Sequence, residues 1–255
     1  MGRLGAFAVA AGVSRAVYEG LRRVRDPRWE RTNHAGRRVS LYAGPATALG
    51  AAAGAGTGAG ALAVLVAGAC GAYDDVRGDE RRGFRAHLAA LRDGEVTSGA
   101  VKLFGIGAAG LAAGAFLKER PVDKLLAGVV IAGTAHLVNL VDVRPGRAGL
   151  VVLGLAAPGL LRGPQAAAPM GAVAAVLADD LGERTMLGDT GAHALGAAVG
   201  TAIAVGNGRL GLAAHAAGLV AAAVHGERRA TGVSAAERQG EAVRTRAAEP
   251  HLSPM

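Results

Sequence analysis

Long apolar stretches, separated by short charged loops, limit the folds open to this chain more than any other feature. Bounded by charged residues, they are Leu4–Leu21, Val39–Tyr73, Gly99–Leu117, Leu125–Val141, Ala148–Leu161, Ala166–Ala178, Ala192–Val205 and Leu210–Val224. The second stretch is too long for one helix, and the glycines around Thr57 predict a tight hairpin of two helices. We therefore expect about nine helices, several of them shorter than the roughly 20 residues that span a bilayer.

The composition favours a membrane protein over a soluble helical bundle. Apolar residues make up 51% of the chain and charged residues only 19%, below the roughly one quarter that is usual in soluble domains. A soluble bundle would need a polar face that recurs at the helical period, and the segment Val122–Val141 carries almost none. The predicted fold class is therefore all-α, a polytopic membrane helix bundle of about nine transmembrane helices over residues 1–225.

The placement of the arginines sets the expected orientation. The loops Arg22–Arg38 and Asp74–Arg92 hold seven and five arginines, and residues 226–255 form a basic tail. Positively charged loops stay on the cytoplasmic side. We therefore expect a multi-pass protein of the cytoplasmic (cell) membrane with its N-terminus outside and its C-terminus and tail in the cytoplasm. Because the arginines lie in loops between apolar helices, they indicate a membrane partner and no nucleic acid.

Acidic residues gather where the predicted helices reach the cytoplasmic face. They are Asp74, Asp75, Asp142, Asp179, Asp180 and Asp189. Carboxylates at membrane depth are costly unless they meet water, a cation or a partner, and such oxygen ligands suit Mg2+ together with substrate phosphates. Nearby arginines such as Arg144 and Arg147 could bind phosphate oxygens. The charge pattern alone also allows ordinary solvated acids, and for Asp179 and Asp180 we expect a solvated pair at a helix end.

Three short motifs lie at the predicted cytoplasmic helix ends. They are Tyr-Asp-Asp at 73–75, Asn-Leu-Val-Asp at 139–142 and Leu-Gly-Asp-Thr-Gly at 187–191. In this order and on this side, the motifs resemble the polyprenyl-phosphate N-acetylhexosamine-1-phosphate transferase superfamily, which includes phospho-N-acetylmuramoyl-pentapeptide transferase. The stretch Arg31–His34, followed by Tyr42–Pro45, is similar to the basic loop before that family's second helix. The resemblance runs from about Arg31 to Gly196.

The resemblance implies a Mg2+-dependent membrane enzyme of cell wall biogenesis whose active site faces the cytoplasm. The implied reaction moves a sugar-1-phosphate from a UDP-sugar to a polyprenyl phosphate lipid and releases UMP. Carried over by residue, the resemblance makes Asp74, Asp75 and Asp142 catalytic and makes Asp189 and Asp75 ligands of the metal. The expected substrate-binding residues are Asn139, Arg144, Arg147, His34 and Lys102. The oligomeric state stays open between a monomer and a homodimer.

The chain departs from the family pattern at three positions. Pro145 stands where the family has the second aspartate of its N-x-x-D-G-x-D-G element, His136 replaces an earlier asparagine, and Ala192 replaces a common serine. We expect His136, on an apolar helix, to be a core residue. These departures leave two alternatives to the enzyme. One is a non-catalytic relative that serves as a lipid-binding or scaffold subunit of a cell-envelope assembly, and the other is an unrelated transporter.

Overall fold

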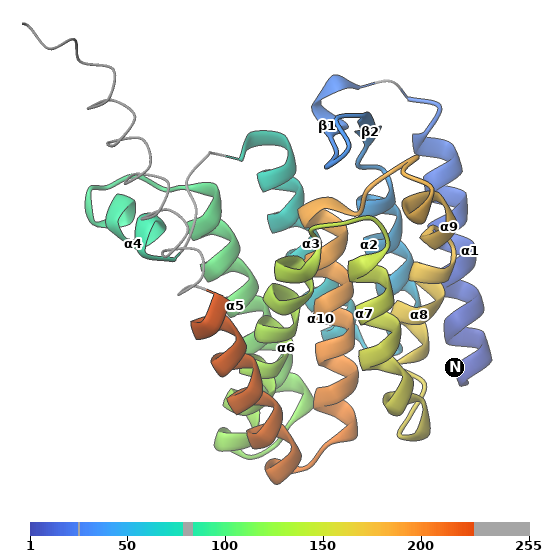
Figure 1. The fold of residues 1–255 in the computed structure, drawn as a ribbon. Helices are drawn as coiled ribbons and strands as arrows, with labels where there is room; N and C mark the ends of the chain where they lie inside the picture. Colours follow the sequence, from blue (N-terminus) through green and yellow to red (C-terminus); the bar gives the residue numbers. More distant parts are fainter. Residues whose placement is uncertain (25, 79–83, 227–255) are drawn as a thin grey trace, which may run out of the picture.

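A computed structural model describes residues 1–24, 26–78 and 84–226, which form a helical bundle with one short pair of strands (Figure 1). The α-helices are α1 (Arg3–Leu21), α2 (Ala43–Gly54), α3 (Gly58–Arg77), α4 (Phe84–Arg92), α5 (Ser98–Leu117), α6 (Pro121–Val141), α7 (Arg147–Ala156), α8 (Ala167–Ala174), α9 (Leu177–Leu181) and α10 (Gly188–Gly206). Residues 209–226 are also helical. The all-α prediction is confirmed, and the predicted basic tail lies, from residue 227 onward, outside the described residues.

The glycine-rich run inside the longest apolar stretch ends one helix and begins the next, as the sequence predicts. α2 ends at Gly54, and Gly56 takes a positive φ of 75°. Thr57 then caps α3, because its Oγ1 accepts a hydrogen bond from the Gly60 N–H at 3.1 Å. Glycine adopts this left-handed conformation at little cost, and threonine is a favoured N-cap. The two helices pack against each other as the predicted hairpin.

Four expected segments differ from the structure, and one of them is the charged loop Asp74–Arg92, which contains α4. The charged Arg22–Arg38 loop contains a 3-10 helix, η1 (Pro27–Trp29), and an antiparallel pair of strands, β1 (Glu30–Thr32) and β2 (Arg38–Ser40). The stretch Ala166–Ala178 is not one helix, because α8 has eight residues and α9 follows with five. α7 also ends early and continues as a 3-10 helix, η2 (Ala157–Leu161). Its Pro158 has no N–H for the next α-helical hydrogen bond.

In the part of the chain that the structure describes, three helices are long and apolar enough to cross a membrane. They are α3, α5 and α6, with 20, 20 and 21 residues. At ~1.5 Å per residue this length matches the roughly 30 Å hydrocarbon core of a bilayer. α2, α7 and α8 have 12, 10 and 8 residues and are too short to cross it alone. Nine complete spans are therefore more than length and composition support.

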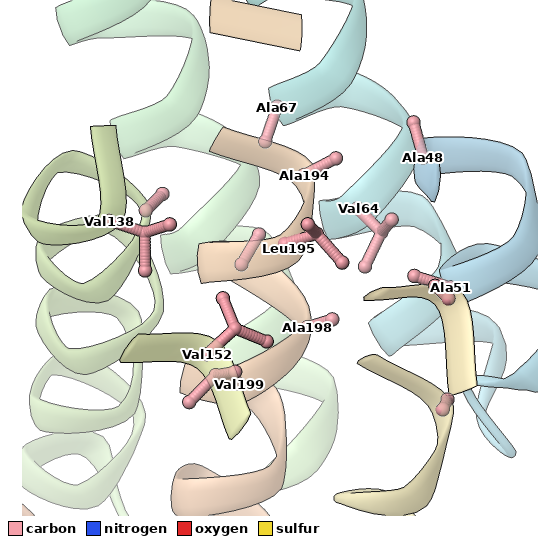
Figure 2. Close-up of a cluster of buried hydrophobic side chains, with 14 of the residues drawn as sticks. Ala48, Ala51, Val64, Ala67, Val138, Val152, Ala194, Leu195, Ala198 and Val199 are labelled. Carbon is pink, nitrogen blue, oxygen red and sulfur yellow. The ribbon is translucent and has the colours of Figure 1, made fainter. Parts of the chain in front are cut away.

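α10 is the central helix of the bundle. It packs against α6, α3 and α2. Figure 2 shows Leu195 and Val199 of α10 in one buried cluster with Val64 of α3, Val138 of α6 and Val152 of α7. All five side chains are fully buried. The side chains on the first turn of α10 are therefore positioned by a helix that other helices surround.

Glycines allow the closest backbone contacts of α10. A Cβ atom on Gly196 would lie 2.6 Å from Cα of Ala135 in α6, and a Cβ atom on Gly71 in α3 would lie 2.3 Å from the backbone oxygen of Asp189. Both distances are far shorter than van der Waals contact, so no larger residue fits without moving a helix. Small residues at such crossings let helix backbones approach closely in lipid. The second contact holds the end of α3 against the first turn of α10.

Candidate functional site

Antiparallel connections bring four helix ends to one end of the bundle. α3 and α6 end there, whereas α5 and α10 begin there, and α1 begins at the opposite end (Figure 1). Ser40 of β2 pairs with Thr185, just before α10, so the strands cover the same end. The three sequence motifs lie at three of these ends, those of α3, α6 and α10, and in the turns beside them. The order of the helices therefore brings the three motifs to the same end of the bundle.

Lys102 joins the acids of two motifs in one ion cluster. Its ammonium group, on α5, donates to Oδ2 of Asp74 on α3 at 2.6 Å and also to Oδ2 of Asp189 on α10. The three side chains are 17%, 21% and 24% exposed, respectively. Ion pairs in such a partly buried place are weakly screened by salt. Lys102 thus holds the ends of three helices together at the point where two carboxylates converge.

Asp75, next to this cluster, caps the N-terminus of α10. Its Oδ1 accepts a hydrogen bond from the Asp189 N–H at 3.0 Å, and its Oδ2 accepts from the N–H and the hydroxyl of Thr190 at 2.9 and 2.6 Å. The first N–H groups of a helix have no partner within the helix and carry a partial positive charge. Asp75 is only 7% exposed. Both of its carboxylate oxygens therefore bind α10, and Asp75 supports the site by holding this helix in place.

A cavity of about 300 Å³ opens beside the ion cluster, between α5, α6, α10 and residues 209–226. Its polar lining consists of His87, Lys102, His136, Asn139 and His193. The rest of the lining is apolar and includes Leu137, Leu140 and Leu219. Two of the sequence-predicted substrate residues, Lys102 and Asn139, are therefore part of one cavity wall.

Two of the cavity histidines face each other from neighbouring helices. The rings of His136 in α6 and His193 in α10 are perpendicular, with centroids 5.4 Å apart. Nδ1 of His193 lies 2.8 Å from the backbone oxygen of Asp189, whereas its Nε2 is buried and has no hydrogen-bond partner. His87 is anchored by a 2.9 Å contact between its Nδ1 and Oγ1 of Thr97. His136 was expected in the core, and the structure places it in the cavity lining instead.

Asp142 lies apart from this cavity, in a small pocket of about 70 Å³. His34, Arg144 and Asp180 also line that pocket. Burial raises the pKa of Asp142 to about 7, and the negative charges of Asp180 and Asp189 add to the effect.

The prediction of a solvated acid pair at 179 and 180 is wrong. Asp179 and Asp180 are only 6% and 4% exposed. Oδ2 of Asp180 accepts from the Gly146 N–H at 3.0 Å and so holds the turn before α7, and burial raises the pKa of Asp180 to about 6. Asp179 instead pairs with Arg15 and Arg184, each at 2.8 Å. These two acids connect the helices around the site.

The structure therefore separates the predicted site residues into groups. Asp74, Lys102 and Asp189 form the ion cluster, Asp75 supports it, and Asn139 lines the adjoining cavity. A second group, Asp142, His34 and Arg144, lies at the small pocket, and Arg147 is exposed at the start of α7. Within the described ranges, no group of three or more His, Cys, Asp or Glu side chains is arranged to hold a metal ion.

Sequence reasoning missed His87 and His193 as members of the site. One signal was present for His193, since it follows Asp189 by four residues and so lies on the same face of a helix. His136 likewise precedes Asn139 by three residues. His87 offered no such signal, because it lies on α4, outside the three motifs.

No protein-family model, no curated protein and no solved structure matches this chain. The chemistry of the site is carried by its own side chains: one ammonium group between two carboxylates, beside a cavity lined by imidazoles and a carboxamide. Such a site offers both charges that phosphate chemistry needs, cationic groups for the phosphate oxygens and acidic groups for a metal ion or a proton.

Proposed function

We propose that the chain is a membrane phosphoglycosyl transferase, which moves a sugar-1-phosphate from a UDP-sugar to polyprenyl phosphate and releases UMP. The observation that carries this proposal is the convergence of Asp74, Lys102 and Asp189 at the ends of three helices, beside a cavity for a ligand. Both substrates are anions, so their reaction requires positive charge that offsets their repulsion and stabilises the transferred phosphoryl group. The motif order along the chain supports the same reaction.

We further propose that this end of the bundle faces the cytoplasm, at the surface of the cell membrane. The arginine-rich segment 22–38 lies at this end, and positive loops remain cytoplasmic. Cysteine labelling in intact cells tests the orientation on a Cys70→Ala background. Ala35→Cys and Gly208→Cys place thiols at exposed positions near opposite ends of the bundle. Labelling of position 208 from outside, with position 35 labelled only after permeabilisation, is the expected result, and the reverse pattern contradicts it.

The donor set fits Mg2+, which proteins bind through one or two carboxylates while substrate phosphates and water complete its shell. Asp74 and Asp189 already direct oxygens to one point, where Lys102 supplies the positive charge. Asp75 fits less well as a metal ligand, because its oxygens would have to give up the hydrogen bonds that cap α10. When bound, Mg2+ would neutralise the charge that develops on the transferred phosphoryl group.

In this proposal the remaining polar groups bind and orient the substrates. Lys102 moves from the carboxylates to a phosphate oxygen, and Asn139 in the same cavity wall donates to the substrate. Burial raises the pKa of Asp142 to about 7. This carboxyl group therefore exchanges a proton near neutral pH. Arg144 and Arg147 are exposed near the small pocket and attract the anionic substrates, with His34 beside them.

A second candidate function has one observation in its favour. Lys102 already compensates two carboxylates, and both oxygens of Asp75 are engaged, so the cluster is satisfied without a metal ion. A non-catalytic relative that binds a lipid phosphate, as a scaffold subunit of a cell-envelope assembly, would need no more than this.

The two functions are separated by one assay. The purified protein in detergent is incubated with polyprenyl phosphate, Mg2+ and a panel of UDP-sugars, and the release of UMP is followed. Release that requires both Mg2+ and the lipid supports the transferase. Binding of polyprenyl phosphate without UMP from any UDP-sugar supports the scaffold and contradicts the transferase.

A further inference from the structure

One nitrogen atom in the wall of the large cavity is a hydrogen-bond acceptor that nothing in the described chain satisfies. His193 is 0% exposed, and burial without a carboxylate partner favours the neutral imidazole. Its Nδ1 faces the backbone oxygen of Asp189 at 2.8 Å, which can only accept, so Nδ1 carries the ring hydrogen. Nε2 is then a lone-pair acceptor, and it is buried without a partner. Leaving such an acceptor unpaired is unfavourable, so the ring is prepared for a donor.

The size and lining of the cavity limit what that donor can belong to. Its volume of about 300 Å³ lies at the lower end of the roughly 300–1,000 Å³ of ligand pockets, so it holds one ring and not a whole nucleotide-sugar. Leu137, Leu140 and Leu219 give it apolar walls, and Asn139 adds a carboxamide. Lys102 lines one side and belongs to the ion cluster. An uncharged ring fits this lining better than a phosphate group does. The phosphate attached to that ring would then point toward Lys102.

We propose that this cavity binds the uncharged ring of a nucleotide-sugar, either the sugar or the base, and that Nε2 of His193 accepts a hydrogen bond from its hydroxyl or N–H. The identity of the ligand rests on the proposed function. Because no atom of His193 is exposed, the donor reaches Nε2 when a neighbour in the wall turns aside. The ring of His136, perpendicular to it at 5.4 Å between centroids, is that neighbour. His193 is therefore a specificity residue, and the phosphate chemistry remains with the ion cluster.

Two substitutions separate the two nitrogens of this ring. His193→Asn places an amide N–H near the position of Nδ1, which keeps the bond to the Asp189 oxygen, and removes the acceptor. His193→Gln places an amide oxygen near the position of Nε2, which keeps an acceptor, and loses the bond to Asp189. His215→Asn is a matched control, because Nδ1 of His215 makes the same type of contact to Gly211, at 2.7 Å, on an exposed surface.

The test measures binding to the purified full chain in detergent by isothermal titration calorimetry. The probes are UDP-N-acetylglucosamine, N-acetylglucosamine 1-phosphate and UMP. We expect His193→Asn to weaken binding of UDP-N-acetylglucosamine by about three- to tenfold, which is the usual worth of one neutral hydrogen bond. His193→Gln weakens it less, and His215→Asn leaves it unchanged. A parallel loss for the sugar phosphate assigns the cavity to the sugar, whereas a loss for UMP assigns it to the base.

A second variant keeps the test valid where His193→Asn does not fold. Leu219→Trp fills the cavity from residues 209–226 without a change in α10, and we expect it to abolish binding of the ring that occupies the cavity. Wild-type affinity in the folded Asn or Trp variant overturns the proposal, as does a wild-type protein that binds none of the three probes. A protein that binds them in a His193-dependent manner but releases no UMP contradicts the transferase alone.

Discussion

The carboxylate of Asp75 holds the first turn of α10 through Thr190. Both the N–H and the hydroxyl of Thr190 donate to Oδ2 of Asp75, at 2.9 and 2.6 Å. The two residues belong to different sequence motifs and different helices. One member of the aspartate pair thus fixes the helix on which Asp189 lies, while the other, Asp74, contacts Lys102.

Replacement of Asp75 should lower the stability of the fold. Asp75→Ala leaves two backbone N–H groups and one hydroxyl at the start of α10 without their acceptor, which we expect to cost roughly 2 kcal/mol, the upper range for loss of a helix cap. Asp75→Asn keeps one acceptor oxygen and should cost less. Thermal unfolding in detergent measures both, with Thr57→Ala as the control for an ordinary N-cap. Equal melting temperatures for Asp75→Ala and wild type would show that the cap is dispensable.

Replacement of Asp189 should affect activity and leave the fold intact. Asp189→Asn keeps the backbone N–H that binds Asp75 and removes the charge that faces Lys102. We expect UMP release to fall by at least about a hundredfold, the scale seen when one electrostatic contact to a transition state is lost, while the protein remains folded. Asp123→Asn serves as a matched control, since Asp123 is paired with Arg209 at 2.7 Å at the opposite end of the bundle. Full activity in Asp189→Asn contradicts the proposed metal site.

Removal of Lys102 should strengthen the response to Mg2+. In Lys102→Met the two carboxylates of Asp74 and Asp189 converge without a cation between them, and a divalent ion can relieve their repulsion. We expect Mg2+ to raise the melting temperature of Lys102→Met more than that of wild type. The further substitution Asp189→Asn should remove this gain. An equal response to Mg2+ in Lys102→Met and wild type would mean that the two acids do not form one cation site.

Asp142 and Asp180 should make the fold less stable as the pH rises toward neutrality. Burial raises their pKa from 3.8 to about 7 and about 6. A carboxyl group whose pKa is higher in the folded than in the unfolded state holds its proton more tightly when folded. Stability therefore falls as the pH rises from about 4 to about 7, and this contribution is constant above that range.

Melting temperatures in detergent at about pH 5 and about pH 8 test this dependence. We expect the value at the lower pH to exceed the value at the higher pH, and Asp142→Asn or Asp180→Asn to reduce the difference. The same pH profile in wild type and in both variants would show that neither carboxyl group contributes.

The sequence predicts those parts of the fold that local chemistry marks. The break between α2 and α3 was predictable because glycines end one helix and Thr57 caps the next. The shared location of Asp75 and Asp189 was predictable as well, because consecutive antiparallel helices bring alternate ends to one face. The split between α8 and α9 was not predictable from hydropathy, because the whole stretch is apolar whether it continues as one helix or turns.

The contacts within the site that the sequence did not predict are contacts between distant segments. Lys102 could have pointed to lipid headgroups, and only the packing of α3, α5 and α10 directs it between two acids. Asp180 looks like a solvated residue at a helix end, but the turn at Gly146 folds over it and buries it. The role of His193 could not be predicted without the position of α6, because helical spacing alone does not show which face of α10 borders a cavity.

The glycine contacts of α10 have a consequence for the evolutionary divergence of this protein. Gly71 and Gly196 leave no room for even a methyl group, and a larger residue at Gly71 would push the backbone of Asp189 away from α3. Outer apolar positions can exchange Leu, Val, Ile and Ala freely in a membrane, so distant homologues will share little of them. These two glycines, together with the acids beside them, are expected to be the last positions to vary, and they form a short signature by which such homologues can be recognised.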